Sequence, residues 1–246
     1  GRAKETKVID FLGKKKIFFI LSAVVIIAGF VTMGVHKGNG GDALNYSLEF
    51  KGGTSTNVEF NEDMSIEELD EKVVPIIEEI SKDANVQTQK VQGSNQVIFK
   101  SATLDVSQRE ELNSRLEEEF GVDPEKITAE TISSTISSEM RTGAVSAVVV
   151  STVLMLLYVW FRFKDVRFGA SSVAALVHDV LVVLTVYALM RISVGNTFIA
   201  CMLTIIGYSV NDTIVIFDRI RENLALKTGK QTAEDLREIA NKSLTQ

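Results

Sequence analysis

The sequence contains a single cysteine, Cys201, among its 246 residues. One cysteine excludes a disulfide framework and any metal site built from several thiolates. Nucleotide- and flavin-binding motifs are also absent: there is no GxGxxG loop, and KTGK at 227–230 lacks the spacing of a phosphate-binding loop. The net charge is −6, which argues against a nucleic-acid binder, because neutralising phosphates needs clustered Lys and Arg. The sequence therefore predicts no bound metal or organic cofactor and no nucleic-acid partner.

Charge is unevenly distributed along the chain. Between His36 and Thr142 there are 22 Asp and Glu residues against 10 Lys and Arg, a net charge of −12, whereas the remainder carries +6. Two opposed compositions in one chain indicate two environments rather than one globule.

Four long runs contain at most one charged side chain each. A bilayer core about 30 Å thick needs about 20 helical residues to cross it. The runs lack the alternation of barrel strands, and the first is too long for a signal peptide and has no A-x-A cleavage site. They therefore predict four transmembrane helices, at 17–35, 143–161, 168–190 and 196–217.

Basic residues mark one side of the membrane. They gather before Ile17, in RFKDVR after Phe161 and in DRIREN after Phe217. Positive segments stay in the cytoplasm, so the N-terminus is expected there and the acidic segment outside. The resulting division is a cytoplasmic N-terminal segment (1–16), the first transmembrane helix (17–35), an extracytoplasmic domain (36–142), three further helices (143–217) and a cytoplasmic amphipathic segment (218–246).

The acidic segment is long enough for one small domain. Apolar alternation around KGGT predicts a strand at 48–50, a tight Gly52-Gly53 feature and a second strand at 58–60. Further strands are predicted within 86–92, 96–100 and 127–136. The order β-α-β-β-α-β matches the ferredoxin-like split motif, an α+β domain with no catalytic constellation.

Two helices of this domain carry terminal signals. Ser65 and Glu68 form a capping box, and Pro75 predicts a kink or an interruption in the helix that follows. Ser107 with Glu110 predicts the start of the second helix, and Gly121 its end.

Asp212, beside Asn211, lies within the fourth apolar run. A carboxylate at a helix centre costs about 2.5–3.5 kcal/mol, so it usually faces a bundle interior or a wet cavity. One interpretation is proton uptake and release, because burial raises the pKa of a carboxyl group and a nearby cation lowers it. The other is a static anchor, hydrogen-bonded by Tyr208 or Ser209 at helical spacing.

Two other polar groups leave alternatives open. His178 and Asp179, at the centre of the third run, are either relay support or an interhelical hydrogen-bond pair. The DRIREN segment either has a coupling role in transport or anchors the helix at the membrane interface. Its charged residues are Asp218, Arg219 and Arg221, and Asp218 can pair with Arg221. Thr232 with Asp235 caps a predicted amphipathic helix on the cytoplasmic surface.

Five stretches together resemble the SecF family, membrane subunits of the bacterial SecD–SecF export complex in the proton-driven RND superfamily. The first is LEFKGGT, with Glu49, Phe50, Gly52 and Gly53, where the family usually has Asp in place of Glu49. The others are VWFRFKDVRFGA (159–170), ALVHDVLV (175–182), TIIGYSVNDTIVIFDRIREN (204–223) and NKSLTQ (241–246).

The resemblance implies a non-enzymatic, multi-pass protein of the bacterial inner membrane, with protons as the coupling ion and Asp212 as the relay carboxylate. The implied partners are SecD, the SecY–SecE–SecG channel, YajC, unfolded secretory polypeptides and the lipid bilayer. Family members continue past LTQ with two more helices, so the chain is expected to be truncated. The alternatives are a small-molecule or lipid exporter subunit of RND type, and a membrane-anchored binding or sensor module.

Overall fold

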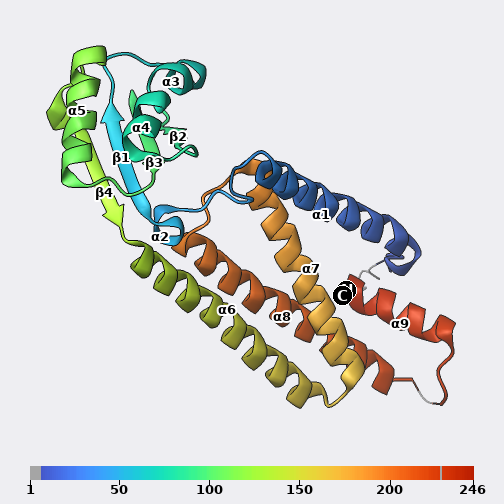
Figure 1. Ribbon diagram of the computed structural model, residues 1–246. Helices are drawn as coiled ribbons and strands as arrows, with labels where there is room; N and C mark the ends of the chain where they lie inside the picture. The colour runs from blue at the N-terminus through green and yellow to red at the C-terminus, as the bar shows by residue number, and fades with distance from the viewer. Residues whose placement is uncertain (1–6, 228) are drawn as a thin grey trace, which may run out of the picture. The chain divides into compact units, whose positions relative to one another are not determined.

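Four helices are long and apolar enough to cross a membrane, and they confirm the predicted multi-pass architecture (Figure 1). In the computed structural model, which describes residues 7–227 and 229–246, they are α1 (Lys15–Gly38), α6 (Ser134–Phe163), α7 (Val166–Met190) and α8 (Asn196–Ala225). A short 3-10 turn, η1 (Leu12–Lys14), precedes α1, and α9 (Ala233–Thr245) follows α8. Arg2 and Lys4 of the predicted N-terminal segment lie outside the described residues.

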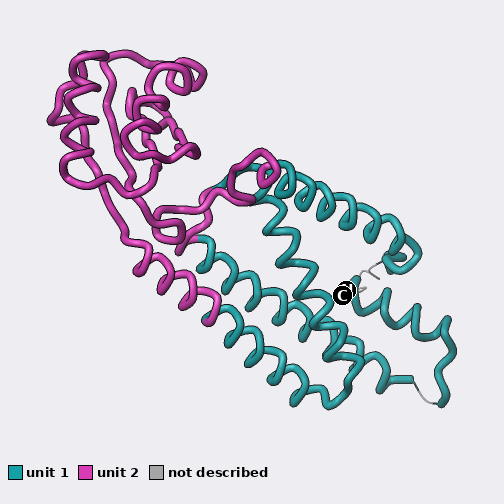
Figure 2. The backbone as a smooth tube through the Cα atoms, viewed as in Figure 1, with its two compact units in different colours: residues 1–35, 147–192, 198–246 teal, residues 36–146, 193–197 magenta. Residues whose placement is uncertain are grey.

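The chain divides into two units (Figure 2). Unit 1 contains residues 1–35, 147–192 and 198–246, and therefore most of the apolar helices and α9. Unit 2 contains residues 36–146 together with 193–197, the turn between α7 and α8. Helix α8 thus begins in unit 2 and continues through unit 1.

Close helix contacts in unit 1 depend on a glycine and on aromatic rings. A Cβ at Gly29 of α1 would meet the Thr185 side chain of α7, so only glycine permits this approach. Helices α6 and α8 meet at Phe163 and Phe217, whose ring centroids are 5.6 Å apart with the planes nearly perpendicular. Many other apolar side chains are exposed, as at Phe19 (71%) and Phe161 (77%), which is typical of residues that face lipid.

Unit 2 is built on a four-stranded antiparallel sheet with the order β2-β3-β1-β4. Its strands are β1 (Gly53–Glu59), β2 (Gln87–Lys90), β3 (Gln96–Ser101) and β4 (Ile127–Ile132). Its helices are α2 (Leu48–Lys51), α3 (Ile66–Lys72), α4 (Val74–Ser81) and α5 (Val106–Phe120), with a 3-10 turn, η2, at Pro124–Lys126. This element order is the one of the split β-α-β motif.

One face of the sheet carries the core of unit 2. In the register, Val58 of β1 lies opposite Val97 of β3, and Phe99 lies two residues farther along β3 on the same face. These side chains pack against Leu69 of α3 and Leu116 of α5, and all of them are almost completely buried. The α3, α4 and α5 helices therefore cover the same face of the sheet.

The capping box of Ser65 and Glu68 is confirmed, and so is the interruption near Pro75. Helix α3 ends at Lys72 and α4 begins at Val74, so the proline occupies the first turn of a new helix. A proline in the first turn is tolerated because its missing N–H has no intrahelical acceptor there.

The strand predicted at 48–50 is wrong, because these residues form the single turn α2. Two apolar residues in alternation are too few to separate a strand from a helical turn. Gly52, with φ of 74°, ends this turn, and Gly53 begins β1.

The cap predicted at Ser107 is also wrong. Asp105 caps α5: its Oδ1 accepts from the Gln108 N–H at 2.8 Å, and the Gln108 side chain accepts from the Asp105 N–H at 2.9 Å. Leu104 is buried, and its N–H donates to Thr54 Oγ1 at 2.9 Å, so the chain is held two residues before the helix starts. The contact of Leu104 with Thr54 thus accompanies a helix cap two residues before the predicted one.

Replacement of Leu69 by Ala should lower the free energy of unfolding of unit 2 by about 2–5 kcal/mol, because a fully buried side chain leaves a cavity. Ile66→Ala in the same helix removes a side chain that is 49% exposed and should change it by less than about 0.5 kcal/mol. Hydrogen exchange of β1 and β3 peptides across a urea series measures both. Equal effects would contradict the assigned core.

Asp105→Ala should increase amide exchange in the first turn of α5 more than Ser107→Ala does. The backbone hydrogen bond from Gln108, followed by the one from the Ser107 hydroxyl, lowers the pKa of Asp105 from its usual 3.8. A lowered carboxyl pKa stabilises the helix above pH 3.8, and this contribution is lost as the pH falls through the folded-state value. Exchange rates compared at pH 6 and below 3.8 test this, and a larger effect at Ser107 would refute it.

Candidate functional site

Asp212 lies on an exposed stripe of α8. Thr204, Tyr208, Asn211 and Val215 share the stripe at spacings of three or four residues, and all are exposed. Within the described residues, no hydrogen bond or ion pair reaches the Asp212 carboxylate. The alternative anchor is not formed, because Tyr208 points outward with 67% exposure and Ser209 is buried. Asp212 therefore has an uncommitted carboxylate in the middle of an apolar helix.

His178 and Asp179 lie on α7 and are satisfied locally. His178 Nδ1 lies 2.9 Å from Asp179 Oδ1, and its Nε2 lies 2.8 Å from Ser22 Oγ on α1. Thr185, two helical turns farther along α7, packs on Gly29 of α1. The contacts are those of an interhelical polar link between α1 and α7, and no hydrogen bond joins either residue to Asp212 in the described part of the chain.

The predicted pairing of Asp218 with Arg221 is not formed. Asp218 Oδ2 instead accepts from Arg162 on α6 at 2.7 Å. Arg221 lies over the Phe163 ring at 5.4 Å, a cation–π contact, and Arg219 pairs with Glu222 at 2.8 Å. The Asp218 carboxylate therefore links α8 to Arg162 of α6 at this end of unit 1.

Asn223 is a residue that sequence reasoning missed. It is buried, and its Nδ2 donates to Ser243 Oγ of α9 at 2.8 Å. A buried side-chain amide needs such a partner. The only signal in the sequence is that Asn223 ends DRIREN without a charge, so its partner could not be read from spacing.

Glu49 holds the start of α8. Its Oε2 accepts from the Asn196 N–H at 3.2 Å and from Ser47 Oγ at 3.1 Å. A carboxylate at a helix N-terminus is stabilised by the helix dipole. The Cβ of any residue replacing Gly195 would lie 2.6 Å from that oxygen, so the contact requires glycine at 195.

Backbone hydrogen bonds add to the Glu49 contacts with Asn196 and Ser47, which together we call the clamp. The Ser47 N–H donates to the Val194 carbonyl at 2.9 Å, and the Val194 N–H donates to the Asn45 carbonyl at 2.7 Å. Tyr46 and Val194 form a parallel β-bridge. Phe50 of the same motif is buried, and a Cβ at Gly53 would meet the Ser101 carbonyl of β3. LEFKGG thus joins the first residues of α8 to the central strand of the sheet.

Known proteins resemble this chain over most of its length. Residues 112–246 match the family described as "Protein export membrane protein SecD/SecF, C-terminal". The chain is 32% identical to the protein translocase subunit SecF of Petrotoga mobilis over 244 residues, which cover 97% of this chain and 77% of that protein. The chain belongs to the SecF family.

Larger relatives contain the same region. The chain is 31% identical to the protein translocase subunit SecDF of Bacillus subtilis over 240 residues, 96% of this chain and 30% of that protein. The crystal structure of SecDF, a translocon-associated membrane protein from Thermus thermophilus, matches with a TM-score of 0.74 at 30% identity. That match covers all of this chain and 32% of the other, so the chain spans about a third of the SecDF proteins.

In this SecF chain, Glu49→Ala should accelerate hydrogen exchange at the start of α8 about two- to five-fold, because a helix-dipole contact contributes about 0.3–1 kcal/mol. Gly195→Ala should do the same by displacing the carboxylate. Glu59→Ala, which removes an acidic side chain near Lys126 in the same unit, is the control. Exchange mass spectrometry of a peptide covering 194–202 measures all three. An unchanged rate in Glu49→Ala would show that the clamp is dispensable.

Proposed function

We propose that this SecF chain, acting with SecD, uses the proton motive force to promote late-stage export of unfolded polypeptides through the SecY–SecE–SecG channel. The protein resides in the bacterial cytoplasmic membrane with its N-terminus in the cytoplasm, and YajC is a further partner. Protons are the coupling ion, and the role is not enzymatic. Support comes from the relatives, which are named as protein translocase subunits.

The single observation that carries the proposal is the uncommitted carboxylate of Asp212. Asp179 is bonded to His178 and Asp218 to Arg162, whereas the Asp212 carboxylate has no bond from any described residue. An ionisable side chain inside a membrane-spanning helix usually marks an ion or proton pathway. Asp212 is therefore the intramembrane group best suited to change its charge during a cycle.

Helix α8 provides the coupling. Its first residue is held through Glu49 in unit 2, and Asn223 near its other end is held by Ser243. Asp212 lies between them, about 24 Å along the helix from Asn196 at 1.5 Å per residue. A shift of α8 that accompanies the charge change would pull on the segment that leads through Gly52 and Gly53 into β1. The sheet domain would then move with the proton cycle and hold the emerging polypeptide.

Asp212→Asn in the full-length SecF protein should reduce export of a secreted reporter to the level of cells that lack the protein, because Asn cannot titrate. Asp179→Asn is the matched control: it removes an intramembrane carboxylate already bonded to His178 and should retain most of the activity. Pulse-chase export with and without a proton motive force measures both. Undiminished export by Asp212→Asn would exclude the relay role.

A further inference from the structure

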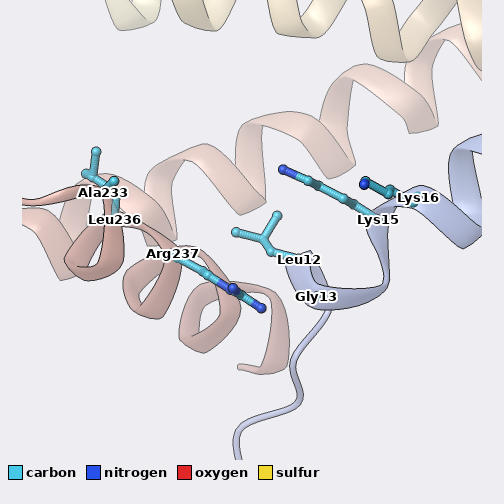
Figure 3. Close-up of a pocket in the computed structure, with 7 residues that line it drawn as sticks. All are labelled: Leu12, Gly13, Lys15, Lys16, Ala233, Leu236 and Arg237. Atoms are coloured by element: carbon cyan, nitrogen blue, oxygen red, sulfur yellow. The ribbon is translucent and has the colours of Figure 1, made fainter.

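A pocket of about 490 Å³ opens between the start of α1 and helix α9 (Figure 3). Its charged lining is entirely cationic: Lys15 and Lys16 come from α1 and Arg237 from α9. The apolar lining consists of Leu12, Ala233 and Leu236. Figure 3 shows Lys15 and Lys16 leaving the first turn of α1 while Arg237 reaches from α9 toward Gly13.

Positive and negative side chains lie in different pockets beside Arg237. Its Nη2 lies 3.0 Å from Asp10 Oδ2, and Asp10 also accepts from the Gly13 N–H at 2.9 Å. The second pocket along Arg237, of about 610 Å³, is lined by the three carboxylates of Asp10, Glu234 and Glu238. Lys15 and Lys16 make no ion pair with any residue between 7 and 246 that the structure describes. The first pocket therefore has an uncompensated positive charge, whereas the second suits no anion.

The position of the two lysines selects the kind of anion. They stand at the charged end of a helix that is long and apolar enough to cross a membrane, and basic side chains at such ends attract anionic headgroups. Directly after them come Ile17, Phe18 and Phe19, with exposed fractions of 65, 53 and 71%. A lysine ammonium is a compact partner for phosphate oxygens, and an adjacent apolar strip accommodates an acyl chain.

We propose that this pocket binds the headgroup phosphate of an anionic phospholipid. Lys15 and Lys16 contact the phosphate, Leu12 and Leu236 cover the glycerol region, and one acyl chain follows the exposed residues of α1. A bound lipid would thereby join the N-terminal segment to α9. The two are already in contact, because the Leu12 N–H donates to Asn241 Oδ1 of α9 at 3.0 Å. The site is independent of the proposed proton relay, because it shares no residue with it.

The test uses the chain purified in detergent, with phosphatidylglycerol as the probe and native mass spectrometry as the readout. Each lysine near a headgroup contributes about five-fold in affinity, so Lys15→Gln/Lys16→Gln should reduce retained phosphatidylglycerol roughly 25-fold. Lys15→Arg/Lys16→Arg keeps both charges and should keep the lipid. Retention by the double Gln variant equal to wild type would overturn the proposal.

Two controls separate this site from general charge and from a soluble ion. Lys14→Gln/Lys37→Gln removes the same charge from residues that do not line the pocket, and it should keep most of the lipid. An equal loss would mean that overall positive charge, and not this pocket, retains the lipid. Glycerol phosphate, added at an excess of about 1,000-fold over the lipid, should not displace it. Displacement would mean that the pocket takes a soluble phosphate and not a lipid.

Discussion

A polar side chain inside an apolar helix is costly without a partner, and this cost organises the membrane-spanning part of the chain. His178 and Asp179 satisfy each other and reach Ser22 on α1. Asp218 finds Arg162 on α6. The bonds to Ser22 and Arg162 tie helices together, because those partners come from other helices. Asp212 is the exception among the three aspartates, and the proposed relay depends on that difference.

Close packing brings these partners within reach. Gly29 lets α1 approach Thr185 on α7, near the link between Ser22 and His178. Gly195 lets the turn before α8 approach Ser47 and Glu49. In each case a side chain in place of hydrogen would separate two segments that a hydrogen bond now joins, so packing and polar contacts depend on each other.

Helix α8 connects the LEFKGG segment, Asp212 and helix α9. Its start is bonded to the LEFKGG segment, its middle carries Asp212, and its end is bonded to α9 through Asn223. Helix α9 in turn contacts the N-terminal segment, where Asn241 and Arg237 bind Asp10. The lipid site that we propose lies beside these last contacts, and the proposed relay lies in the helix that they support.

The sequence by itself determined the number of apolar helices, the acidic composition of the domain between them, and the positions of the intramembrane carboxylates. Periodicity and charge are local properties, so uncharged runs and capping boxes such as Ser65 with Glu68 can be read directly. Tertiary structure decided what periodicity leaves open. It selected Asp105 over Ser107 as a cap, Arg162 over Arg221 as the partner of Asp218, and a helical turn over a strand at Glu49. These outcomes depend on contacts between residues far apart in the chain, which no local pattern encodes.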